Sequence, residues 1–86
     1  MMKIRKLCPG ENPPWELLEL ADPSRMIVEG YVKSSCVYVG EISGEIRAVY
    51  VLKETEKVVV EVMNIAVDEV HQGKGLGKQL ISHAIN

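Results

Sequence analysis

Apolar residues alternate with other residues over 37–42 and 46–53, and Ser43–Gly44 between the two runs is typical of a tight hairpin turn. In the second run Ile46, Ala48, Tyr50 and Leu52 are expected on one face of a strand. Residues 58–67 are apolar except for Glu61 and Asn64. Such a run predicts a third long strand, buried on both faces in the middle of a sheet.

Helical spacing marks three other segments. Pro13–Pro14 suits the first turn of a helix that continues to Ala21. Asp22 is predicted to cap a second helix, with Pro23 at its first position, although Gly30 inside it costs about 0.5–1 kcal/mol. A third helix is expected from residue 75 onward, and residues 2–7 form a short first strand. The pattern predicts one α/β (mixed α+β) domain with the element order β-α-α-β-β-β-α.

Composition narrows the class of protein. The chain has 86 residues, is 47% hydrophobic and carries a net charge of −2, which argues against nucleic-acid binding through bulk charge. We expect no membrane span, because no apolar run approaches the required length, and no signal peptide, because an apolar core is missing at the N-terminus. Cys8 and Cys36 have neither metal-knuckle nor disulfide-framework spacing, so a cytoplasmic chain with reduced thiols and no metal is expected. His71 and His83 are interpreted as a loop residue and a helix-surface residue.

The segment 70–86 differs from the rest in charge and glycine content. It contains Lys74 and Lys78 but no acidic residue, and it holds three of the chain's seven glycines. A glycine loop between a strand and a helix exposes amide N–H groups at the positive end of the helix dipole. The expected ligand is therefore a phosphate or pyrophosphate. The dinucleotide fingerprint G-x-G-x-x-G fails because its third glycine falls on Lys78 or Leu80, and the P-loop pattern fails as well.

The pattern that does fit is Gln72-x-x-Gly75-x-Gly77, preceded by a strand that ends in residues 64–67 and followed by an apolar helix. This arrangement resembles the acetyl-CoA loop of the GCN5-related N-acetyltransferases, the GNAT family. The order of elements is similar to the first half of that fold. Residues 1–86 are therefore expected to form a single partial GNAT domain, truncated after the CoA-loop helix, with the C-terminal half of the fold absent.

The resemblance implies roles for individual residues. Backbone N–H groups of Gly73, Gly75, Gly77 and Lys78 would hold the CoA pyrophosphate, and Gln72 and Lys74 belong to the same cofactor-binding set. Ile65 and Val67 would pair with the pantetheine arm, and the N–H of Ile65 would polarise the thioester carbonyl. Glu61 is the candidate general base. The alternative for Glu61 is a sheet carboxylate without a catalytic role.

The function implied by the resemblance is transfer of an acetyl group from acetyl-CoA to a primary amine, by direct attack in a ternary complex. The alternative is a non-catalytic CoA-binding or assembly module that pairs through its open sheet edge. The expected partners are acetyl-CoA, an amine acceptor, and either a second copy of the chain or the missing C-terminal half. No residue of this chain is assigned as the acid that protonates the leaving thiolate.

Overall fold

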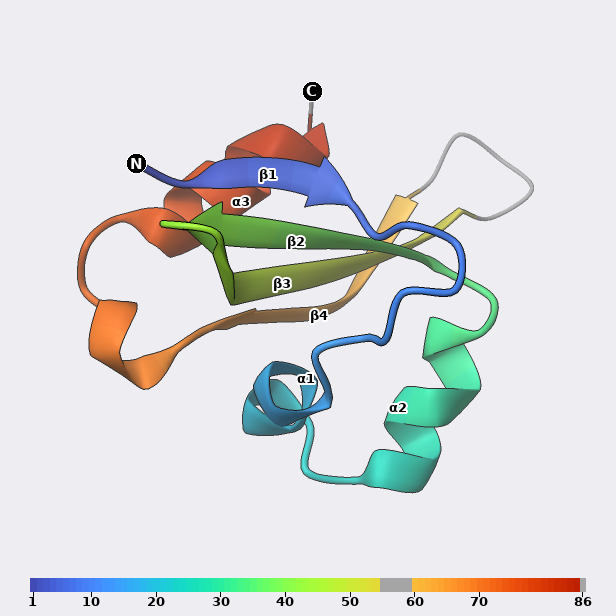
Figure 1. The fold of residues 1–86 in the computed structure, drawn as a ribbon. Helices are drawn as coiled ribbons and strands as arrows, with labels where there is room; N and C mark the ends of the chain where they lie inside the picture. Colours follow the sequence, from blue (N-terminus) through green and yellow to red (C-terminus); the bar gives the residue numbers. More distant parts are fainter. Residues whose placement is uncertain (55–59, 86) are drawn as a thin grey trace.

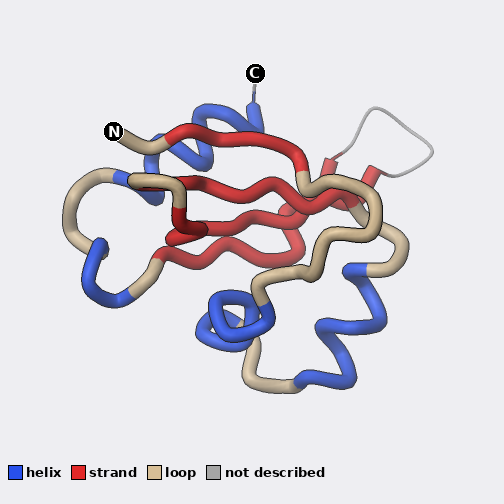
Figure 2. The backbone as a smooth tube through the Cα atoms, viewed as in Figure 1, coloured by secondary structure: helices blue, strands red, loops and turns tan. Residues whose placement is uncertain are grey.

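The computed structural model describes residues 1–54 and 60–85. Its elements follow in the order β1 (Lys3–Lys6), α1 (Trp15–Ala21), α2 (Arg25–Val32), β2 (Cys36–Ile42), β3 (Glu45–Glu54), β4 (Val60–Val67), the 3₁₀ turn η1 (Glu69–His71) and α3 (Leu76–Ile85). The predicted order is confirmed (Figures 1 and 2). Residues 58 and 59 of the predicted third long strand lie outside the described residues.

The four strands form one sheet in the order β1-β2-β3-β4, and each neighbouring pair is antiparallel. The predicted hairpin joins β2 to β3, and Ser43 and Gly44 both adopt positive φ, 54° and 81°. Within the described residues β4 pairs only with β3, so the expectation that it lies in the middle of the sheet is not met. Val62 is half exposed. The prediction was wrong on this point because an apolar run by itself cannot distinguish a central strand from an uncovered edge strand.

Helices cover both faces of the sheet (Figure 1). On one face α1 and α2 bury a cluster that includes Leu18, Val28, Val39, Val49 and Val51. On the other face α3 buries a second cluster, which comprises Met2, Ala48, Tyr50, Leu76 and Leu80.

The predicted faces of β3 hold for Ala48, Tyr50 and Leu52, which belong to the α3 side, but not for Ile46, which packs on the α1 side. A register shift lies next to it: Gly40 pairs with Ala48, but Glu41 pairs with Ile46. Such a bulge adds one residue to β3 and reverses the side-chain alternation beyond it.

The start of α2 differs from the prediction. The helix begins at Arg25 with Ser24 as its N-cap, whereas Asp22 is the C-cap of α1. The Asp22 carboxylate accepts the N–H of Ser24 at 3.2 Å, a local turn that occupies the side chain before the helix begins. Asp22 and Pro23 therefore form the link between the two helices.

Candidate functional site

The backbone of β4 presents alternate residues to its free edge. The N–H of Asp68, directly after β4, donates to the carbonyl of Arg47 at 2.8 Å. Antiparallel strands alternate between residues that bond the neighbour and residues that face away from it. Ile65 and Val67 therefore direct their N–H and carbonyl groups away from β3, toward the side of β4 that no described strand covers.

The loop after β4 folds back onto this edge. The side-chain Nε2 of Gln72 donates to the carbonyl of Val67 at 2.9 Å. Gly73 and Gly75 both have a φ of +80°, a conformation that side chains with a Cβ rarely adopt. These two glycines allow the chain to turn from η1 into α3 within a few residues.

The helix α3 starts beside the same edge. Its first intrahelical bond is donated by the N–H of Gln79 to the carbonyl of Gly75 at 3.2 Å. The amides of Leu76, Gly77 and Lys78 in the preceding turn have no intrahelical acceptor. Lys74 and Lys78 are exposed next to these amides. The start of α3 therefore combines N–H donors, a positive dipole end and two cationic side chains.

A groove of about 370 Å³ runs along the free edge of β4. One wall is formed by Leu20 and Ala21 at the end of α1, and the other by Gly77 and Ile81 of α3. Its floor is formed by Ile65, Ala66, Val67 and Gln72. The structure thus brings four of the candidate site residues together in one groove: Ile65, Val67, Gln72 and Gly77.

Sequence reasoning missed part of this groove. Leu20 and Ile81 are 49% and 50% exposed, although their helices have well-buried faces. Helical periodicity alone gives no sign that the side chain of Ile81 lies over an open edge of the sheet. The tertiary structure shows that Leu20 and Ile81, both half exposed, line the same groove beside the glycine loop.

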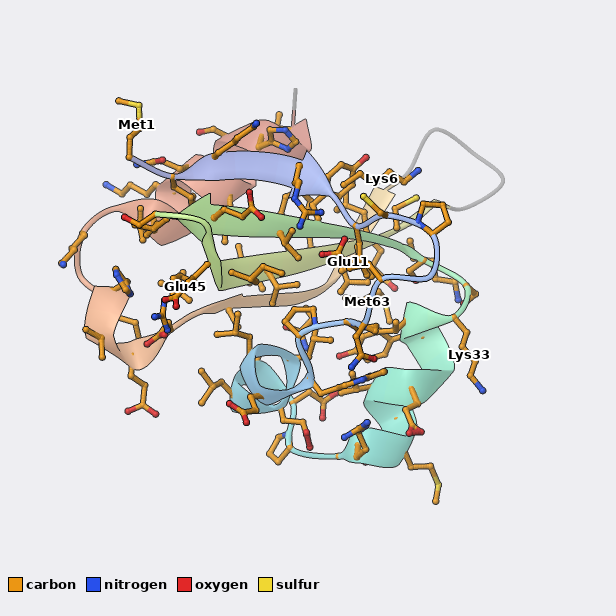
Figure 3. The ribbon with its side chains drawn as sticks, viewed as in Figure 1. Met1, Lys6, Glu11, Lys33, Glu45 and Met63 are labelled. Atoms are coloured by element: carbon orange, nitrogen blue, oxygen red, sulfur yellow. The ribbon has the colours of Figure 1, made fainter. Side chains whose placement is uncertain are left out.

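An ion pair anchors the loop to β3. The Arg47 guanidinium donates to the Asp68 carboxylate at 2.9 Å and also pairs with Glu45 near the β2–β3 hairpin (Figure 3). The other Asp68 oxygen accepts the N–H of Val70 at 2.9 Å. These bonds, with the Val70 N–H contributing most, lower the pKa of Asp68 below its ordinary value.

The candidate base Glu61 stands apart from the groove. It is exposed on β4 and lies opposite Lys53 of β3. By the pairing register it shares the face of the sheet that carries α1 and α2. A register shift separates it from Ile65, since Val51 pairs with Asn64 but Leu52 pairs with Val62, which leaves Met63 as the extra residue of a bulge.

His83, Cys8 and Cys36 do not line the groove. The hydroxyl of Tyr50 hydrogen-bonds Nδ1 of the exposed His83 at 2.5 Å, and burial raises the pKa of Tyr50 to about 12. Cys8 and Cys36 are both free. Among residues 1–54 and 60–85, no helix is long and apolar enough to cross a membrane.

Comparison with known proteins identifies the fold. The sequence profile of the family described as "Acetyltransferase (GNAT) domain" matches residues 33–86. A Bacillus subtilis protein named uncharacterized N-acetyltransferase YvbK is 46% identical over 71 residues, which cover 83% of this chain and 46% of that protein.

Two solved structures superpose closely. One is a GNAT family acetyltransferase from Elizabethkingia anophelis with acetyl-CoA bound, with a TM-score of 0.94, 36% identity and coverage of 98% of this chain and 55% of that chain. The other is a Bacillus subtilis acetyltransferase in complex with CoA, with a TM-score of 0.89, 40% identity and coverage of 99% and 56%. This chain spans about half the length of these relatives. From its sequence profile and its fold, the chain belongs to the GNAT acetyltransferase family.

Proposed function

We propose that the free edge of β4, the groove beside it and the start of α3 form an acetyl-CoA site. The observation that carries this proposal is the convergence of three kinds of group. The outward N–H groups of Ile65 and Val67 suit the amides of a pantetheine arm, and the 370 Å³ groove suits its apolar atoms. The amides at the start of α3 suit a pyrophosphate, with Lys74 and Lys78 adding attraction. The acetyl-CoA and CoA complexes of the two superposed structures support the same cofactor.

The proposed reaction is acetyl transfer to a primary amine within a ternary complex. The amine nitrogen attacks the thioester carbonyl, so a C–N bond forms and the C–S bond breaks. The N–H of Ile65 stabilises the charge that develops on the carbonyl oxygen. Glu61 accepts a proton from the attacking amine, and the CoA thiolate leaves with a proton from a group that this chain does not supply.

The alternative proposal is a CoA-binding or assembly module without catalysis. It is favoured by the half-exposed Val62 and by the outer side of β4, which pairs with no strand in the described part of the chain and offers an edge for another strand. The two proposals share the cofactor site and differ in activity. Acetyl transfer to a panel of primary amines, with the protein saturated in acetyl-CoA, distinguishes them.

Gly77 provides the sharpest test of the cofactor site. A Cβ added there meets no atom within 4 Å, and a carboxylate in the first turn favours the helix dipole. Gly77→Glu should therefore fold with a melting temperature at least as high as that of the wild type, but its charge should repel the pyrophosphate. We expect CoA affinity in calorimetry to fall by about tenfold or more.

Gly77→Gln is the matched control, because it has the same shape without the charge. Its loss of CoA affinity should be smaller than that of Gly77→Glu, and raising the salt concentration should narrow the difference. Unchanged CoA affinity in Gly77→Glu would contradict the proposed site.

A further inference from the structure

Asn64 is the one buried polar or charged residue found in the described part of the chain, with 5% of its surface exposed. It lies directly after the bulged Met63, which packs between the sheet and α2 (Figure 3). Its neighbours on this face form the apolar cluster around Leu18 and Val51. An asparagine in such a place has to be explained by what its amide bonds.

The amide of Asn64 joins three elements. Its Nδ2 donates to the carbonyl of Leu18 in α1 at 2.9 Å and to the hydroxyl of Tyr31 in α2 at 2.9 Å. The Leu18 carbonyl also accepts the N–H of Asp22 at 3.1 Å, the bond that ends α1. Asn64 therefore holds α1 near its last turn, from a point on β4 directly before Ile65.

This connection is not the arrangement that stability alone would favour. The other amide atom, Oδ1, is buried and has no hydrogen-bond partner among residues 1–54 and 60–85. An apolar side chain of similar size would avoid an unsatisfied acceptor in this cluster. What the asparagine provides is a fixed distance and direction between β4 and α1, which an apolar contact does not impose.

The two elements that Asn64 joins form one wall and the floor of the groove. Leu20 and Ala21 of α1 belong to the wall, and Ile65 and Val67 of β4 belong to the floor. We propose that Asn64 is a positioning residue, which sets the width of the groove by holding α1 against β4 and so determines how well the pantetheine arm of CoA fits. This inference rests on the proposed acetyl-CoA site.

The test compares two ligands that share the nucleotide end. CoA uses the groove and the loop, whereas ADP keeps the pyrophosphate and has no pantetheine arm. Asn64→Leu removes both hydrogen bonds at similar volume. In the full chain we expect it to weaken CoA binding by about tenfold and to leave ADP affinity within about twofold, as measured by NMR titration.

Val28→Ala is the control for a general loss of stability, because Val28 is fully buried in the same cluster and does not line the groove. Both ligands should bind it with unchanged affinity at a temperature where it is folded. An equal loss for CoA and ADP in Asn64→Leu, or no loss for CoA, would overturn the inference.

A second variant covers the case in which Asn64→Leu does not fold. Tyr31→Phe keeps the ring in the core and removes one of the two partners of Asn64. It should weaken CoA binding by about threefold with ADP unchanged, and unchanged CoA affinity would overturn the inference. If the wild type itself binds no CoA, the proposed function fails instead, so the two failures are distinguishable.

Discussion

The side-chain amide of Gln72 donates to the main-chain carbonyl of Val67 at 2.9 Å, which ties the glycine loop to the strand that precedes it. The bond occupies one acceptor at the free edge of β4 and leaves the N–H of Val67 facing outward. It also places the start of α3 beside the groove. A polar side chain in an exposed loop is thus a structural part of the proposed cofactor site.

Replacing Gln72 should weaken CoA binding without unfolding the protein. Gln72→Met removes the donor at similar length, and the loss of one hydrogen bond corresponds to about two- to tenfold in affinity. Gln72→Arg should retain most of the affinity because arginine also donates. Calorimetry of both variants checks this, with Gln79→Met as the control. Equal affinities for Gln72→Met and wild type would show that the bond does not order the loop.

Glu61→Gln tests the general base. If Glu61 removes the amine proton, kcat at neutral pH should fall by about 10²–10⁴-fold. The loss should shrink at higher pH, because more of the amine is then deprotonated without help. Glu16→Gln, an exposed carboxylate change on α1, serves as the control. If kcat of Glu61→Gln stays within about twofold of the wild-type value at every pH, Glu61 is a structural residue and not the general base.

The Arg5–Glu11 pair should make stability depend on pH. Arg5 donates to both Glu11 oxygens at 2.8 Å, and with the N–H of Cys8 it lowers the pKa of Glu11 from 4.5 to about 2. A carboxylate with a lowered folded-state pKa stabilises the fold above its unfolded pKa and loses this effect as pH falls toward the folded value. The difference in urea midpoint between wild type and Glu11→Gln should therefore be full above about pH 5 and disappear near pH 2. A difference that stays constant over this range would contradict the assignment.

Gly30→Ala should stabilise the protein. Gly30 lies inside α2, its φ is not positive, and an added Cβ meets no atom within 4 Å. Alanine in a helix interior is favoured over glycine by about 0.5–1 kcal/mol. Chemical denaturation should show this gain, with CoA affinity unchanged. A destabilised variant would contradict the prediction.

The edge of β4 should promote association of the 86-residue chain. Val62 is 50% exposed on a strand whose outer side has no partner in the described residues. A lysine on an edge strand opposes pairing with another chain. In sedimentation at tens of micromolar, wild type should associate and Val62→Lys should shift toward monomer. Ile27→Lys, which changes an exposed residue of α2, is the control and should leave the association unchanged. A wild-type monomer with a cooperative thermal transition would contradict the prediction.

The local sequence determined the order of the elements and the character of the glycine loop. Side-chain periodicity distinguishes strands from helices because it reflects the backbone geometry of each segment alone. The glycine content of the loop indicated a backbone that can take dihedrals other residues avoid, and in the structure Gly73 and Gly75 both adopt positive φ. The cap of α2 was assigned two residues too early, because Asp22 and Ser24 are both good caps and only the folded chain shows which one the helix uses.

Only the tertiary structure decided which groups meet at the site. The ion pair between Arg47 and Asp68, the wall formed by Leu20 and the bonds of Asn64 to α1 and α2 all join residues far apart in the chain. Such contacts depend on sheet register and helix placement, which a one-residue bulge at Met63 can change. The sequence of an apolar strand is the same whether its edge is covered or open. The free edge of β4 could therefore be recognised only from the order of strands in the folded sheet.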